Sequence, residues 1–178
     1  DGFAWLFMVL VAGIGLLVIL YARYYMAPED PVPRLYSCLL AFAGAMSGLV
    51  LSGNIIVLVV FWELTSIVSF LLIGYSGHRI FARRSAITAL IVTTFGGLAM
   101  LAGLIMLAHF AGSWRFSGVL EAAPALMADA GLRGLLEVAV ALVLIGALTK
   151  SAQAPFHFWL PGAMAAPTPE SAYLHAAA

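Results

Sequence analysis

The chain has 178 residues, of which 64% are hydrophobic and only 9% are charged. Soluble globular domains carry about 25% charged residues, so this composition excludes a soluble enzyme, a disordered segment and a nucleic-acid-binding module. Eight basic residues balance eight acidic ones, and no basic cluster of the kind that binds nucleic acid is present. The lipid bilayer is therefore the expected solvent, and an all-α, polytopic membrane helix bundle is the expected fold class.

Uncharged apolar stretches follow one another along the chain, and a membrane span takes about 20 such residues. One continuous run is too long for a single span, and the turn signal at 52–54 (Ser-Gly-Asn) divides it. We therefore expect about five full transmembrane helices and the start of a sixth, at 2–22, 35–52, 55–75, 85–114, from 138 onwards and from 169 onwards. The charged segment 115–137 is expected to be a loop outside the membrane.

The arginines that flank these helices predict their orientation. Five of them fall on one side, namely Arg23, Arg34, Arg79, Arg83 and Arg84, whereas Arg115 and Arg133 fall on the other. The positive-inside rule makes the five-arginine side cytoplasmic. Because the sequence stops at Ala178 shortly after a new helix begins, we expect an internal fragment of a longer membrane protein.

Two charges lie deep in apolar stretches, where each costs a few kcal/mol to insert. Glu63 is near the middle of the helix at 55–75, and Lys150 lies roughly 18 Å beyond Val138 along its helix. Such groups usually face a bundle interior or a water-filled cavity and pair with each other, so these two are the candidate translocation residues. Two alternatives stay open: Glu63 as a protonated structural crosslink, and Lys150 with its stem extended to the membrane interface.

A proline follows the buried lysine closely. Pro155 removes a backbone N–H, and its ring clashes with the carbonyl group of Ser151 in a continuous helix. We therefore expect the helix to kink or break beside Lys150, with Ser151 and Gln153 satisfying the freed backbone groups. Broken membrane helices line cavities and build ion sites in transporters; an ordinary structural kink is the alternative.

Two histidines extend this polar set, because histidine exchanges protons near neutral pH. His157 lies two helical turns after Lys150 and would share its face if the helix resumed, and His175 lies about five residues into the last helix. A hydrogen-bonded structural role is the alternative for each. The sequence holds no Walker A, GxGxxG, HExxH or CxxC motif, so we expect no cofactor, no metal and no enzymatic activity.

Two motifs resemble those of a known family. They are residues 61–66 (FWELTS) and residues 150–169 (KSAQAPFHFWLPGAMAAPTP). Together they resemble the antiporter-like subunits shared by Mrp-type cation/proton antiporters and respiratory complex I. Within that group the sequence is most similar to the large A subunit of Mrp-type Na⁺/H⁺ antiporters.

The resemblance covers nearly the whole chain and implies its organisation. Residues 1–178 would be a single membrane domain fragment, with 1–33 as a leading transmembrane helix and loop, and 34–178 as most of the first five-helix antiporter repeat. In the family, the residues that match Glu63 and Lys150 form an ion pair at the break of a discontinuous helix, and a histidine matching His175 continues the polar path. Positions that would support the path or the break are Ser66, Ser151, Gln153, Pro155 and His157.

The implied function is that of one component of a multi-subunit secondary antiporter, which moves protons through a buried Glu63–Lys150–His175 path in exchange for Na⁺. The expected partners are the lipid bilayer, other membrane subunits of the complex, Na⁺ and H⁺, and the expected location is the cell (inner) membrane of a prokaryote, with multiple spans. A proton-pumping subunit of complex I or of a membrane-bound hydrogenase is the alternative, and a structural subunit without an ion path is a third. Glu170 departs from the family, which more often has an apolar residue there, although the helix dipole favours an acid in a first turn.

Overall fold

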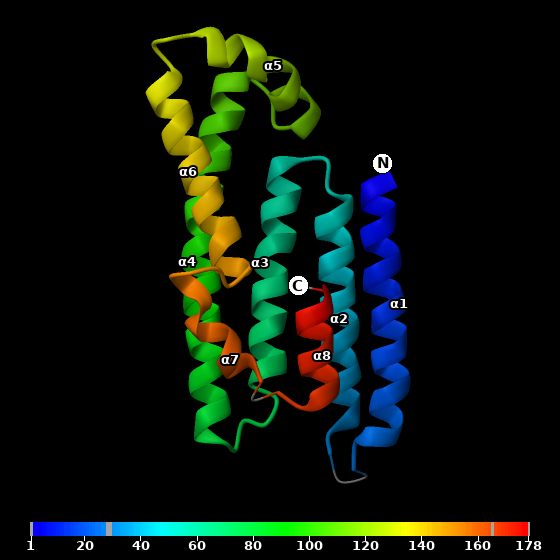
Figure 1. Cartoon of the computed structure of the whole chain (residues 1–178). Helices are drawn as coiled ribbons and strands as arrows, with labels where there is room; N and C mark the ends of the chain where they lie inside the picture. The colour runs from blue at the N-terminus through cyan, green and yellow to red at the C-terminus, as the bar shows by residue number, and fades with distance from the viewer. Residues whose placement is uncertain (1, 28–29, 165, 178) are drawn as a thin grey trace.

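The computed structural model describes residues 2–27, 30–164 and 166–177, and its helices form an elongated bundle (Figure 1). Four helices are long and apolar enough to cross a membrane: α1 (Gly2–Tyr25), α2 (Val32–Leu51), α3 (Ile55–Ile73) and α4 (Ile80–Ala111). They are followed by α5 (Phe116–Ala128), α6 (Arg133–Lys150), the short 3-10 helix η1 (Phe156–Trp159), α7 (Leu160–Ala163) and α8 (Thr168–Ala177). The predicted all-α membrane bundle, with one helix discontinuous near Lys150, is confirmed.

The segment between α4 and α6 differs from the predicted loop. Most of it is α5, which lies across one end of the bundle (Figure 1) and has no buried residue. With Pro124 inside it, α5 is too short for a membrane span. Its apolar residues recur at helical spacing, and Phe116 and Val119 pack, partly buried, against the core cluster that contains Met100 and Leu104. Helix α6 also begins five residues earlier than expected, and it includes Arg133 and Glu137, which pair on its exposed surface at 3.3 Å.

Helices α4 and α6 pack closely through small residues. A Cβ atom at Gly146 of α6 would lie 2.8 Å from the carbonyl oxygen of Gly96 on α4, and one at Gly103 would meet the carbonyl oxygen of Ala139. Small residues let membrane helices approach to backbone contact in this way. Thr149 packs directly on Gly96, near the midpoint of α4. The end of α6 therefore lies at mid-depth in the bundle.

The first turns of α8 are held in the bundle by a buried tyrosine. The hydroxyl of Tyr173 donates to the carbonyl oxygen of Val11 on α1 at 3.0 Å, and its ring packs edge-on against Phe42 of α2 at 5.2 Å. Its hydroxyl lies so near Gly15 that a Cβ atom there would be 2.7 Å away. This single side chain links α8 to two membrane helices far away in the sequence.

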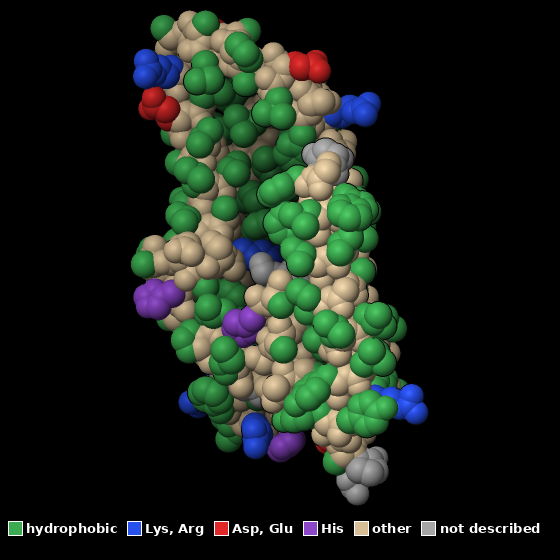
Figure 2. Space-filling view, turned by 45° about the vertical axis from the view of Figure 1, so that its right-hand side comes forward, with side chains coloured by type: hydrophobic (Ala, Val, Ile, Leu, Met, Phe, Trp, Pro, Cys, Tyr) green, Lys and Arg blue, Asp and Glu red, His purple; other side chains and the backbone are tan. Residues whose placement is uncertain are grey.

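Lys, Arg, Asp and Glu side chains gather at the two ends of the molecule (Figure 2). The face between the ends carries many hydrophobic side chains, together with histidines and a basic group deep in a hollow. Large hydrophobic side chains are exposed between the ends, for example Leu16, Leu17 and Leu20 on α1 and Ile87, Ile91 and Phe95 on α4. Lipid chains or neighbouring membrane helices fit such an exterior, and water does not.

Candidate ion-translocation site

Helix α6 ends directly after Lys150 with a specific hydrogen-bond pattern. The N–H of Gln153 donates to the carbonyl oxygen of Leu148 at 3.0 Å, and the N–H of Ala152 donates to the carbonyl oxygen three residues before it at 3.3 Å. These two bonds make a Schellman cap, which needs a left-handed residue after the helix. Ala152 supplies it with a φ of 50°. The break thus precedes Pro155, which lies four residues after the C-cap Ser151 and does not itself end the helix.

Side chains satisfy the carbonyl groups that the break exposes. The hydroxyl of Ser151 donates to the carbonyl oxygen of Ala147 at 2.7 Å, and the amide of Gln153 donates to the carbonyl oxygen of Ser151 at 3.4 Å. The indole N–H of Trp159 in η1 donates to the carbonyl oxygen of Thr149 at 2.9 Å. Lys150 therefore lies at a helix end whose exposed carbonyl groups have hydrogen-bond donors.

We expect Ala152→Gly to stabilise the protein, because a left-handed residue with a Cβ atom costs about 1 kcal/mol that glycine avoids. The gain should be about 0.5 to 1 kcal/mol, measured as thermal unfolding in detergent. Ala141→Gly, in a regular exposed turn of the same helix, is the matched control and should cost about 1 kcal/mol. If both variants lose stability equally, the left-handed cap is not formed.

The ammonium group of Lys150 points into the bundle and reaches the middle of α3. Its Nζ atom donates to the carbonyl oxygen of Trp62 at 2.9 Å, to the hydroxyl of Thr65, and to the hydroxyl of Ser66 at 3.2 Å. Nζ also lies 4.6 Å from the centre of the Trp62 ring. A lysine has three donors, so these acceptors satisfy it, and the indole face adds a cation–π contact. The side chain therefore does not extend to the membrane interface.

Glu63 faces α4. Its Oε1 atom is buried and has no hydrogen-bond partner in the part of the chain that the structure describes. Gly97 of α4 is so near that a Cβ atom there would overlap this oxygen. Among the described residues no nitrogen–oxygen contact within 4.0 Å joins Glu63 to Lys150, although the two charges are close enough to act on each other.

The helical repeat explains this arrangement. Successive residues of an α-helix are rotated by about 100°. Lys150 contacts the face of α3 that carries Trp62, Thr65 and Ser66, which are three and four positions apart. Glu63 is one position away from Trp62 and so points to a different neighbour.

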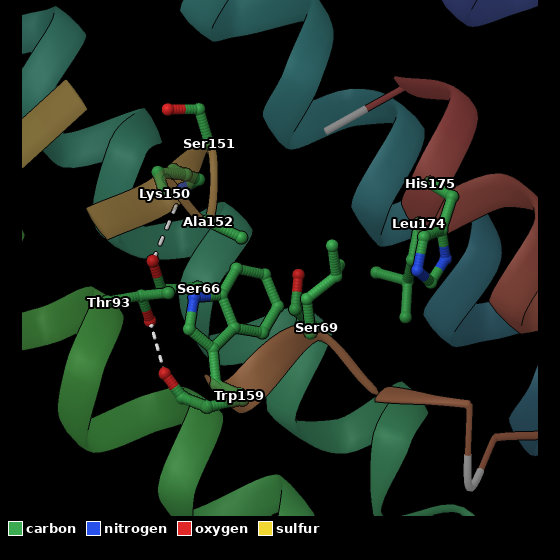
Figure 3. Close-up of a pocket in the computed structure, with 11 residues that line it drawn as sticks. Ser66, Ser69, Thr93, Lys150, Ser151, Ala152, Trp159, Leu174 and His175 are labelled. Carbon is green, nitrogen blue, oxygen red and sulfur yellow. Dashed lines mark hydrogen bonds between the residues drawn. The ribbon is translucent and has the colours of Figure 1, made fainter. Parts of the chain in front are cut away.

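A cavity of about 280 Å³ opens beside the ammonium group, between α3, α4, the broken helix and α8. The residues that line it include Ser66, Ser69, Thr93, Lys150, Ser151, Leu174 and His175 (Figure 3). Figure 3 shows Lys150 hydrogen-bonded to Ser66 on one side. His175 and its neighbour Leu174 lie on α8 on the other side, with Ser69 between. Much of the cavity wall is apolar, but its hydroxyl groups, Lys150 and His175 offer hydrogen-bond partners to water. A space of this size has room for several water molecules, which can carry protons between groups that do not touch.

The two histidines differ in position. His175 lines the cavity, and its Nδ1 atom lies 2.7 Å from the carbonyl oxygen of Ser171, one turn back. His157 is exposed in η1 and does not line the cavity. Because the α-helix does not resume directly after the break, the two-turn spacing from Lys150 does not place His157 on the lysine's face.

The structure adds three residues that the sequence prediction did not assign to the site. Trp62 and Thr65 hold the ammonium group, and Gly97 makes room for the carboxyl group of Glu63. The spacing of 62, 65, 66 and 69 along one helix face was the signal for the first two. Nothing local to Gly97 marks its role, which depends on how α4 packs against α3.

These features define a class of protein: a multi-pass helical membrane protein with a partly buried lysine at a helix break, beside a cavity whose wall carries hydroxyl groups and a histidine. The family described as NADH:quinone oxidoreductase/Mrp antiporter, TM, matches residues 52–178, and the family described as NADH-Ubiquinone oxidoreductase (complex I), chain 5 N-terminus, matches residues 1–36. The chain belongs to the NADH:quinone oxidoreductase/Mrp antiporter family, and the predicted resemblance to Mrp-type antiporter subunits is confirmed.

Individual relatives agree with this assignment. Over 177 residues the chain is 62% identical to the A/B subunit of a probable K(+)/H(+) antiporter of Rhizobium meliloti, covering 99% of this chain and 17% of the relative. It is 48% identical to the A subunit of the Na(+)/H(+) antiporter of Alkalihalophilus pseudofirmus, covering 99% of this chain and 22% of the relative. The chain thus spans about a fifth of the length of these curated relatives.

Solved structures share the fold. The Mrp complex from Dietzia sp. DQ12-45-1b matches with a TM-score of 0.89 and 37% identity, over 98% of this chain and 19% of that chain. An archaeal membrane-bound sulfane sulfur reductase matches with a TM-score of 0.82 and 22% identity, over 95% of this chain and 34% of that chain. The second likeness shows that the same helical fold also occurs in a respiratory membrane complex.

Proposed function

We propose that this chain belongs to one component of a multi-subunit secondary antiporter in a prokaryotic inner membrane, and that protons pass through the Lys150 cavity in exchange for Na⁺. Residues 34–178 would supply most of the first five-helix repeat, 1–33 the preceding helix, and the five-arginine side would face the cytoplasm. The observation that carries the proposal is the position of Lys150, which lies at a helix break at mid-depth, beside a cavity whose wall carries hydroxyl groups and His175. A charged side chain at this depth costs free energy, and a purely structural subunit would gain nothing from it.

In this proposal Lys150 binds and releases the transported proton. The carbonyl and hydroxyl acceptors on α3 and the negative charge of Glu63 favour the charged ammonium, whereas burial favours the neutral amine. A small change in the distance between Lys150 and Glu63 then shifts the balance between the two forms. The released proton would move through the cavity towards His175, which lines its far side.

K⁺ is a second candidate for the exchanged cation. The Rhizobium meliloti relative, which is 62% identical, is described as part of a probable K(+)/H(+) antiporter, whereas relatives at 48% and 46% are described as parts of Na(+)/H(+) antiporters. Nothing in the Lys150 cavity selects between these ions, because its polar groups are suited to protons and water. Exchange of either cation for protons is consistent with the same central lysine.

Inverted membrane vesicles that carry the complete parent complex test the proposal. An independent pump imposes a proton gradient, a pH-sensitive dye follows it, and Na⁺, K⁺ or choline is then added at equal concentration. We expect Na⁺ to collapse the gradient and choline to have no effect; collapse by K⁺ instead would assign the other cation. No response to either cation, together with proton pumping that requires NADH or another reductant, would contradict the antiporter and favour the redox-driven alternative.

A further inference from the structure

Glu170 is a buried carboxyl group outside the Lys150 cavity. It lies in the first turn of α8, its side chain is 0% exposed, and neither carboxyl oxygen finds a hydrogen-bond partner among the described residues. A favourable helix dipole contributes about 0.3 to 1 kcal/mol, but leaving a buried polar group unpaired costs about 1 to 3 kcal/mol. The helix terminus therefore does not account for an acid at this position.

Charged and titratable groups from neighbouring elements face Glu170. Arg34 and Cys38 come from α2, and Tyr75 comes from the turn after α3; each interacts electrostatically with the carboxyl group. The guanidinium of Arg34 also lies 5.7 Å above the ring of Tyr75. Tyr173, on α8 itself, has its hydroxyl satisfied by α1. Glu170 thus has one cation nearby that stabilises a carboxylate, and apolar surroundings that stabilise the neutral acid.

Tyr75 connects this carboxyl group with a polar hollow at the arginine-rich end of the bundle. The hollow has a volume of about 530 Å³, and its lining includes Tyr75 and, as charged or titratable groups, Tyr25, Asp30, His78 and Arg79. The hydroxyl of Tyr75 is buried and unpaired within the described chain. Burial raises the pKa of this hydroxyl above the ordinary tyrosine value, and the acids Glu170 and Asp30 act in the same direction, so it keeps its proton at neutral pH.

In the direction of the C-terminal end of α8, the residues after Glu170 reach the central cavity that holds Lys150. Leu174 and His175, about one turn further along α8, both line the cavity that holds Lys150. Four residues of helix span only about 6 Å. Thr168, two residues before Glu170, lines the polar hollow, so along α8 Glu170 lies between the two spaces. It lines neither of them, and no described lining residue of either space is a fully buried acid.

We infer that Glu170 is a second proton-binding site of this chain, which takes a proton from water in the polar hollow past Tyr75 and passes it to water in the Lys150 cavity. The inference rests on the proposed function. When Glu170 holds the proton, its neutral acid is stable in the apolar surroundings. When Glu170 has released the proton, Arg34 stabilises the carboxylate. The proton moves along one side of α8, and no other bond is made or broken.

Infrared difference spectra of the complete complex, recorded between two pH values, test whether Glu170 binds a proton at all. We expect a protonated-carboxyl band in the wild type that is missing in Glu170→Gln. Glu137→Gln, at an exposed surface pair, is the matched control and should keep the band. Identical spectra for the wild type and Glu170→Gln would overturn the inference. This readout needs no transport, so it separates a failure here from a failure of the antiporter proposal.

Exchange measured in vesicles across a range of pH then tests the relay. Glu170→Gln is expected to lower the rate several-fold and to change its pH dependence, while Glu137→Gln behaves as the wild type. Glu170→Leu removes an unpaired carboxyl group, so it should be at least as stable as the wild type and still exchange slowly. Wild-type rates at every pH in both Glu170 variants would overturn the relay.

Discussion

Lys150→Ala is expected to abolish cation-driven proton exchange without preventing assembly. Alanine removes the group proposed to bind the proton, but it leaves few unsatisfied partners behind. Thr65 already donates to the carbonyl oxygen of Trp62 at 2.7 Å, and Ser66 donates to the same oxygen at 3.3 Å. The vesicle assay should therefore fall to background while size-exclusion chromatography shows an intact complex.

Lys150→Arg separates a proton carrier from a fixed charge. Arginine keeps the positive charge but does not release a proton in proteins. If Lys150 carries the proton, exchange is lost in the arginine variant as well as in the alanine variant. Full exchange by Lys150→Arg would mean that the site needs only a charge, and full exchange by Lys150→Ala would remove the lysine from the mechanism altogether.

Gly97→Ala is expected to have the second largest effect, although it adds only one methyl group. The new Cβ atom would overlap Oε1 of Glu63, so either the carboxyl group turns away or α3 and α4 separate. Overpacking of this kind costs about 1 to 3 kcal/mol, and the displaced charge should slow exchange strongly. Thermal unfolding and the vesicle assay measure the two effects.

Two further variants make the Gly97 experiment specific. Gly44→Ala is the matched control, because no atom lies within 4 Å of the position that its Cβ would take. Combining Gly97→Ala with Glu63→Asp, which shortens the acid by one methylene group, should recover part of the lost stability, since contacting residues are not additive. If Gly97→Ala behaves like Gly44→Ala, Glu63 does not occupy the position described here.

The sequence predicted the features that depend on local signals. The length of the apolar stretches revealed α1 to α4, and a charge followed by Pro155 marked the break beside Lys150. Helix α5 was missed because the charges and Pro124 in the segment favoured a loop, although Phe116, Val119 and Ala123 recur at the spacing of an amphipathic helix. The start of α6 was placed too late because Arg133 and Glu137 look like a loop when their pairing is not visible.

The site was harder to predict than the fold. Whether Lys150 meets Glu63 or its neighbours depends on how α3 is rotated about its own axis, and one residue changes that rotation by about 100°. The family resemblance implied a direct ion pair, whereas in this structure the ammonium group is held by Trp62, Thr65 and Ser66. The proton path through Glu63, Lys150 and His175 stays a prediction that the variants above address.

The continuous helix α4 restricts how the two segments that flank the break can move. Helix α6 is fixed along one half of α4 by Gly96 and Gly146, and α7 packs on the other half, where a Cβ atom at Gly162 would lie 3.0 Å from the hydroxyl of Ser85. The continuous helix α4 therefore contacts the segments on both sides of the break. Because the segments on both sides of the break pack against the same continuous helix, neither can slide along α4 without losing these close contacts.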